Sequence, residues 1–223
     1  MTILITADLH LNAWMRESRD PFASTAPIIS HLDGLIIAGD LANNPMYQWP
    51  RALSRIGRLI DPARVWIIPG NHDYWNGHLD GDAAMRRSRM TMPDHRRIRC
   101  DEDMASGQIG PENTINVHQD HLDWLSQAMA KPWDGQRLVI AHHAPCAAAA
   151  APLNGLSAAF ASNLEVWIGT RRPDGWFFGH THRQFSGKIH GVPINNISFG
   201  YPDEIADGTE AAHVLRGLVA ITA

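Results

Sequence analysis

Short continuous runs of apolar residues recur along the chain, and each is followed by glycine, charged or histidine residues. The runs are residues 1–6, 34–38, 65–68, 138–141 and 176–178. Unbroken apolar runs of this length are typical of strands buried on both faces, as in parallel sheets. The segments between the early runs have the length of strand–helix units, which indicates an α/β fold.

Apolar residues at helical spacing predict two longer helices between these runs. In residues 47–60 the apolar positions lie on one face with arginines opposite, and Asp61-Pro62 marks the end of the helix. Residues 116–129 follow the same period up to Lys131-Pro132. Weaker patterns predict a short helix over residues 81–90 and a loop or short helix over residues 147–151.

The C-terminal part of the chain predicts a β-hairpin and a final strand. Residues 185–189 and 192–197 are extended runs joined by His190-Gly191, a pair that suits a tight turn with left-handed backbone. Val214 to Ile221 has the pattern of a last strand. No run between Asp73 and Arg137 predicts a strand.

Composition indicates a soluble, single-domain protein that spans residues 1–223. Its hydrophobic fraction is 44%, which suits one sizeable core. The net charge of −4 argues against a general binder of nucleic acids or of anionic membranes. Cys100 and Cys146 are the only cysteines, so no disulfide framework is expected and a cytoplasmic location is the simplest. No apolar stretch approaches the length of a membrane span.

Residues that can bind metal ions follow all five apolar runs. They are Asp8 and His10, Asp40, Asn71 with His72 and Asp73, His142 with His143, and His180 with His182. Residues two apart on an extended backbone point to one side, so the pair His180 and His182 can serve one ion or two adjacent ions. A single pair of this kind also fits surface histidines. Because the motif recurs after every run, we expect these side chains to meet at the carboxyl ends of the strands.

The order of the motifs adds a resemblance to a known family. Asp8-x-His10, Gly39-Asp40, Gly70-Asn71-His72-Asp73, a histidine after the fourth run, and Gly179-His180-Thr181-His182 follow one another along the chain. This set resembles the calcineurin-like metallophosphoesterase superfamily. The resemblance implies a four-layer α-β-β-α sandwich of two mixed sheets flanked by helices, with the metal site at the C-terminal ends of the strands. Related members usually have further strands where residues 74–137 predict none.

The resemblance also implies a ligand set for two divalent ions, which could be Mn, Fe or Zn because carboxylate, amide and imidazole donors suit all three. Of the two neighbouring histidines after the fourth run, His142 is assigned as the ligand, and His143 is left outside the ligand set. Asp40 would bridge the ions, since a carboxylate has two oxygens. One ion would be held by Asp8, His10 and His182, and the other by Asn71, His142 and His180.

The reaction implied by this family is phosphoester hydrolysis by a metal-bridging hydroxide. Two ions in such a centre bind phosphoryl oxygens and supply a nucleophile at neutral pH. His72 and Asp40 are the catalytic candidates. His72 would stabilise the transition state or protonate the leaving oxygen. We expect Asp73 or the bridging carboxylate to orient the His72 ring.

The substrate is constrained less closely than the reaction. Leu41-Ala42 follows Asp40, whereas protein phosphatases of the superfamily have Asp-Arg-Gly there, so a small phosphorylated molecule is expected. Asn196 and Tyr201 are expected to be structural or to line the cleft.

Two alternatives to a phosphoesterase of small molecules are a nuclease and a non-catalytic scaffold. The complete ligand set argues against the scaffold. A nuclease would use the basic residues between 86 and 99, which also fit a solvated helix face and loop. These are Arg86, Arg87, Arg89, Arg96, Arg97 and Arg99.

Overall fold

The computed structural model describes residues 1–44, 46–75, 98, 109–150 and 157–221. One of its two sheets has the strand order β3-β2-β1-β8. The strands of this sheet are β1 (Thr2–Thr6), β2 (Gly34–Ala38), β3 (Val65–Ile68) and β8 (Leu218–Ala220). The first three are parallel, and β8 pairs antiparallel with β1. The sheet is therefore mixed, with its parallel strands ending at one common edge.

The second sheet is also mixed and has the order β4-β5-β7-β6. Its strands are β4 (Leu138–Ile140), β5 (Gly175–Phe178), β6 (Ser186–Ile189) and β7 (Val192–Asn196). The strands β4, β5 and β7 are parallel, and β6 pairs with β7 as the predicted hairpin. His190 and Gly191 form its turn with φ values of 48° and 85°, as predicted.

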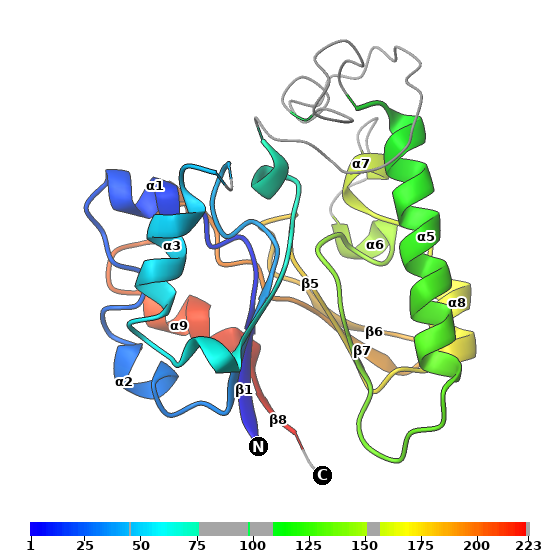
Figure 1. Cartoon of the computed structure of the whole chain (residues 1–223). Helices are drawn as coiled ribbons and strands as arrows, with labels where there is room; N and C mark the ends of the chain where they lie inside the picture. The colour runs from blue at the N-terminus through cyan, green and yellow to red at the C-terminus, as the bar shows by residue number, and fades with distance from the viewer. Residues whose placement is uncertain (45, 76–97, 99–108, 151–156, 222–223) are drawn as a thin grey trace.

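Helices cover the outer face of each sheet, which gives four layers (Figure 1). The helices α1, α2, α3 and α9 lie on one side and α5, α6, α7 and α8 on the other. The α-helices are α1 (Leu11–Arg16), α2 (Ala26–Ile29), α3 (Trp49–Ile56), α5 (Pro111–Ala130), α6 (Ala147–Ala150), α7 (Ser157–Phe160), α8 (Glu165–Arg171) and α9 (Glu210–Val214). The 3-10 helices of the described residues are η1 (Pro62–Arg64), η2 (His72–Tyr74), η3 (Pro202–Glu204) and η4 (Leu215–Gly217). The predicted α-β-β-α sandwich is confirmed.

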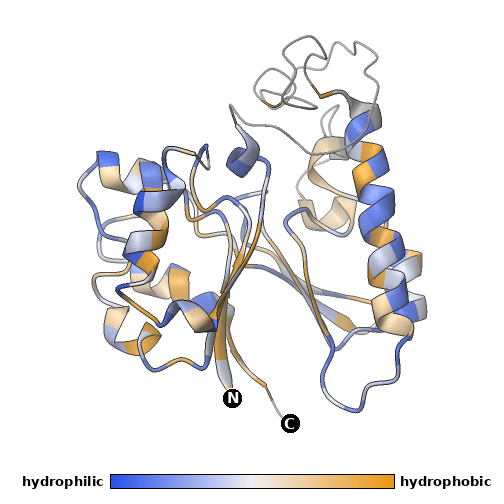
Figure 2. Cartoon of the chain, in the orientation of Figure 1, coloured by the Kyte–Doolittle hydropathy of each residue, from blue (hydrophilic) through white to orange (hydrophobic). Residues whose placement is uncertain are grey.

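The unbroken apolar pattern of β1 is explained by burial of both faces of its sheet. Leu4 packs in the core between this sheet and its helices, where Trp14 is fully buried. Ile3 and Ile5 point the other way, into the core that contains Phe177 of the second sheet. Figure 2 shows hydrophobic colour along much of β1 and β8. Alternating side chains thus hold the two sheets together and hold the helices on the outside.

One strand prediction was wrong over part of its length. Residues Val214 to Gly217 are helical, and only Leu218–Ala220 form β8. The apolar run divides because its residues serve two layers: Val214 is buried in the helix-side core, whereas Val219 packs between the sheets. Arg216 donates a hydrogen bond of 2.6 Å to the carbonyl of Ser198 and fixes the turn between the two parts.

The segment between Asp73 and Arg137 contains α5, longer at its start than the predicted helix over 116–129. The described residues of this segment include no strand. The helix predicted over 81–90 and the arginines from 86 to 99 lie outside the described residues. In the part of the chain that the structure describes, no helix has the length and apolar character needed to cross a bilayer.

Candidate metal centre

The five ligand-bearing motifs converge because the parallel strands end at the same edges of the two sheets. The prediction of extended backbone at the paired motifs was wrong, since the chain turns sharply after each strand. Five candidate residues have left-handed backbone with φ between 40° and 68°: Asp8, His10, Asp40, His180 and His182. Such residues are uncommon outside glycine and gather at functional sites. The turns direct both side chains and backbone N–H groups into the site.

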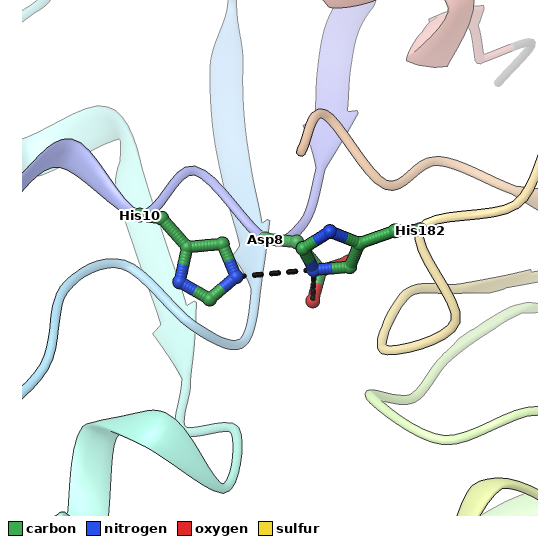
Figure 3. A group of neighbouring side chains, drawn as sticks. All are labelled: Asp8, His10 and His182. Carbon is green, nitrogen blue, oxygen red and sulfur yellow. Dashed lines mark hydrogen bonds and ion pairs between the residues drawn. The ribbon is translucent and has the colours of Figure 1, made fainter. Parts of the chain in front are cut away.

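One cluster joins Asp8 and His10, which follow β1, to His182, which follows β5 (Figure 3). The Nε2 atoms of His10 and His182 are 3.1 Å apart, and the His182 Nε2 lies 3.6 Å from a carboxylate oxygen of Asp8. Asp8 also accepts a 2.8 Å hydrogen bond from the backbone N–H of His180. The carboxylate and both imidazoles therefore face a common point.

A second cluster joins Asp40, His142 and His180. The His142 Nε2 lies 3.0 Å from the Asn71 side-chain oxygen and 3.5 Å from Asp40 Oδ2. That same Asp40 oxygen is 3.9 Å from the Nε2 of His10 in the first cluster. Asp40 thus lies between the clusters, and its carboxylate faces histidines of both.

The donor chemistry of the two clusters fits divalent metal ions. His142 Nδ1 donates 2.9 Å to the Ala38 carbonyl, so Nε2 carries the lone pair of the neutral ring. This lone pair faces the oxygens of Asn71 and Asp40, which are acceptors as well. An added proton or a metal cation is needed to make such an arrangement favourable.

His182 repeats this arrangement in the first cluster. Its Nδ1 donates to Glu204 Oε2 at 2.7 Å, which directs Nε2 toward His10 and Asp8. Carboxylates that orient an imidazole in this way are common behind metal-binding histidines. In addition, His180 Nε2 is buried without a hydrogen-bond partner among the described residues, which suits an atom that binds a metal ion.

The histidines divide into two electrostatic groups. Burial lowers the pKa of His10 to about 3 and lowers the pKa of His180 well below its usual value. Burial also opposes the charged form of His142, but the Asp40 carboxylate outweighs it and raises the pKa of His142 to about 9. Burial likewise opposes the charged form of His182, but the nearby Asp8 carboxylate and the hydrogen bond to Glu204 outweigh it and raise the pKa of His182 to about 10. Without metal, each cluster therefore holds one cationic imidazole at neutral pH.

Glycines before Asp40 and Asn71 make room for the candidate ligands. Gly39 has a φ of 95°, and a Cβ atom there would overlap the His142 ring. A Cβ atom at Gly70 would overlap the Asp40 carboxylate and approach the His142 ring. Close approach of the backbone to side chains thus requires glycine at both positions, and at Gly39 the positive φ also favours it.

Asp73 holds the turns that follow β2 and β3. Its Oδ2 accepts backbone hydrogen bonds of 2.8 Å from both Asp40 and Gly70. Its Oδ1 accepts 2.9 Å from the Trp49 indole N–H and 3.3 Å from the Ala42 N–H. Burial, followed by the charge of Asp40, raises the pKa of Asp73 to about 6. This carboxylate therefore fixes the backbone around the site.

The His72 ring is oriented by Asn43, whereas we expected Asp73 or the bridging carboxylate to orient it. His72 Nδ1 lies 3.0 Å from Asn43 Oδ1, and the His72 N–H donates 2.9 Å to Asp40 Oδ1. The ring stacks on Trp75 with centroids 3.6 Å apart. It also meets His10 edge to face at 4.8 Å and lies within ligand distance of His10 and Asp40. His72 is thereby held beside both clusters.

Three further residues support the site. Tyr201 stacks on His10 with centroids 4.1 Å apart, which gives it a cleft-lining position. Asn196 is buried and donates 2.9 Å to Thr181, which supports the loop between His180 and His182. His143 is exposed, and its ring contacts that of His180 at 4.3 Å. Glu204 and Asn43 were not found from the sequence because nothing in their local pattern links them to distant histidines.

Comparison with known proteins defines the class. The family model for calcineurin-like phosphoesterases matches residues 1–184, and the chain therefore belongs to this family. It is a metallophosphoesterase, a member of a family of metal-dependent hydrolases. No curated protein matches the chain.

Solved structures with the same arrangement of elements include phosphopantetheinyl hydrolase (PptH) from Mycobacterium tuberculosis. It is 16% identical with a TM-score of 0.56, over 91% of this chain and 90% of that one. A predicted phosphoesterase from Streptococcus pneumoniae is 14% identical with a TM-score of 0.37, over 89% and 73%. Vacuolar protein sorting 29 from Cryptosporidium parvum is 14% identical with a TM-score of 0.36, over 92% and 79%. At these identities the likeness to the first supports the fold alone.

Proposed function

We propose that this protein hydrolyses a small phosphomonoester or phosphodiester at a centre of two divalent metal ions. The observation that carries the proposal is the position of Asp40 between two clusters of metal-binding side chains. Its Oδ2 lies 3.5 Å from His142 Nε2 and 3.9 Å from His10 Nε2. A carboxylate placed in this way can be shared by two ions.

The candidate ligands divide between the two sites as the family resemblance implies. Asp8, His10 and His182 would hold one ion, and Asn71, His142 and His180 the other. The set has imidazole, carboxylate and amide donors without a thiolate, which suits Mn, Fe or Zn. When bound, such ions polarise a phosphoryl group and supply a water-derived nucleophile at neutral pH.

His72 is the proposed catalytic residue that does not belong to this ligand set. The Asn43 hydrogen bond fixes one ring nitrogen, and contacts with Trp75 and His10 fix the ring plane. A histidine held beside both clusters can stabilise charge on the phosphoryl oxygens or donate a proton to the leaving oxygen. Asp40 supports it by accepting the backbone N–H of His72.

The mycobacterial hydrolase gives no support for a particular substrate of this chain, because 16% identity supports only the fold. A small phosphorylated molecule remains the proposed substrate class. The net charge of −4 gives no support for nucleic acid as a general partner.

Hydrolysis of p-nitrophenyl phosphate and bis-p-nitrophenyl phosphate tests the proposal. We expect turnover that requires added Mn²⁺ and stops with chelator, and the ratio of the two rates distinguishes monoester from diester preference. His72→Ala should lower kcat by about 10²–10⁴ while the metal content stays the same. His118→Gln, an exposed histidine on α5, is the matched control and should leave kcat unchanged. Folded protein with two bound ions and no turnover of either ester would overturn the proposal.

A further inference from the structure

A surface pocket lies beside the candidate catalytic residues and is not part of the two clusters. Its volume is about 300 Å³. It lies between the C-terminal end of α1, the segment that follows Asp40, and the N-terminal end of α3. Its polar lining consists of Asn12, Arg16, Asn43, Tyr47, Gln48 and Arg51.

The pocket is basic although the chain as a whole is acidic. Among the described residues, two arginines and no carboxylate line it. Arg16 donates from Nε to the Asn12 carbonyl at 3.3 Å, which anchors its guanidinium at the wall. Arg51 is exposed and forms no ion pair with any residue that the structure describes. By contrast, Arg55 on the same helix is neutralised by Asp20.

The pocket shares a wall with the catalytic residues through two asparagines. Asn43 contacts His72 through its side-chain oxygen at 3.0 Å. Its backbone N–H donates 3.1 Å to Asn12, which follows His10 by two residues. The Gln48 Oε1 is buried and has no hydrogen-bond partner in the described part of the chain. Polar groups thus continue without interruption from His72 into the basic pocket.

We propose that this pocket binds a second anionic group of the substrate, a phosphate or a carboxylate. This inference rests on the proposed function, and it narrows the substrate class to small phosphoesters that carry a second negative charge. Two arginines that have no acidic partner in the described ranges offer charge-assisted hydrogen bonds to such a group. Asn43 contacts His72 and also lines the pocket. The second anionic group would therefore belong to the leaving group of the substrate, beyond the oxygen that His72 would protonate.

Binding is tested first without catalysis. Metal-depleted protein is titrated with inorganic phosphate and separately with malonate, and the backbone and arginine Nε–H signals are followed by NMR. We expect saturable shifts at Arg16, Asn43 and Arg51, and the stronger of the two anions identifies the group. Arg51→Gln should abolish the shifts, whereas Arg58→Gln, an exposed arginine beyond the end of α3, should preserve them. No saturable shift at the pocket with either anion would overturn the inference.

Specificity is tested with substrates that differ only in the second charge. The Mn²⁺-loaded protein is given phenyl phosphate, 4-carboxyphenyl phosphate and 1,4-phenylene bisphosphate. We expect the charged leaving groups to be preferred, and the kcat/KM ratio over phenyl phosphate to fall about tenfold in Arg51→Gln. A ratio unchanged in Arg51→Gln would contradict the inference. If the wild type hydrolyses none of the three, the proposed function fails, and the titration alone still decides whether the pocket binds anions.

Discussion

At the scale of single residues, the site depends on which ring nitrogen of each histidine carries a proton. The Ala38 carbonyl and the Glu204 carboxylate fix Nδ1–H in His142 and His182, so both Nε2 atoms face acceptor groups. Burial keeps His10 neutral beside them. The same atoms can therefore bind a proton or a metal ion, and the two compete.

Metal affinity should consequently rise with pH well above neutrality. Raised pKa values of about 9 for His142 and about 10 for His182 mean that both rings bind a proton at pH 7 without metal. Metal must displace these protons, so affinity increases as pH rises toward these pKa values and levels off above them. Calorimetric titration with Mn²⁺ in buffers of different ionisation enthalpy measures the protons released.

Glu204→Gln provides the control for this prediction. It removes a carboxylate that raises the pKa of His182, so fewer protons should be released near pH 8. An affinity that is constant between pH 7 and pH 9 in the wild type would contradict the expectation for both histidines.

At the scale of elements, the turns that follow the strands are fixed by specific contacts rather than by the intrinsic backbone preferences of their residues. Left-handed residues and closely packed glycines bring the chain around after β1, β2 and β5. Asp73 then ties the turns after β2 and β3 together through four N–H donors. The positions of Asp40 and Asn71 depend on this carboxylate.

Asp73→Asn should destabilise the protein and lower its metal affinity. Each Asp73 oxygen accepts hydrogen bonds from two N–H donors. In either orientation of the substituted amide side chain, its NH₂ group would replace one of these oxygens and would face two N–H donors without an acceptor. The expected loss in the free energy of unfolding is about 1–3 kcal/mol, measured by urea denaturation with chelator present. Asp134→Asn, an exposed site, should cost nothing measurable. Equal midpoints for the two variants would show that Asp73 does not have this role.

At the scale of the whole molecule, the candidate site joins the two sheets. One sheet supplies Asp8, His10, Asp40 and Asn71, and the other supplies His142, His180 and His182. The core between the sheets, with Ile5 and Phe177, holds the two halves in register. Metal ions bound here would be held by both sheets at once.

Metal should therefore stabilise the entire fold. Mn²⁺ at 100 times its dissociation constant is expected to raise the free energy of unfolding by about 2.7 kcal/mol per site, because the unfolded chain lacks the assembled ligands. Thermal unfolding with Mn²⁺ and with chelator measures this increment. It should shrink strongly in Asp40→Asn and persist in Asp134→Asn. An identical melting temperature with metal and with chelator would argue against a bound ion.

Much of the fold was predictable from the sequence because its signals are local. Five apolar runs predicted β1 to β5, and the turn at His190-Gly191 predicted the hairpin of β6 and β7. The strand predicted over Val214 to Ile221 was wrong in its first half, because this apolar segment forms a helix in one layer and a strand in another. The hydrophobic pattern along the sequence does not distinguish burial in two different layers.

The sequence by itself determined the types of ligand and their places after the strands, since residue identity and strand periodicity are local properties. Only the tertiary structure decided how Asp40 lies between two clusters, and that Asn43 and Glu204 orient His72 and His182. These contacts join residues 22 to 102 positions apart along the chain, and His72 and Asn43 are 29 positions apart. Such pairs meet only when the turns of neighbouring strands, or of the two sheets, are brought together by folding, and no local preference specifies them.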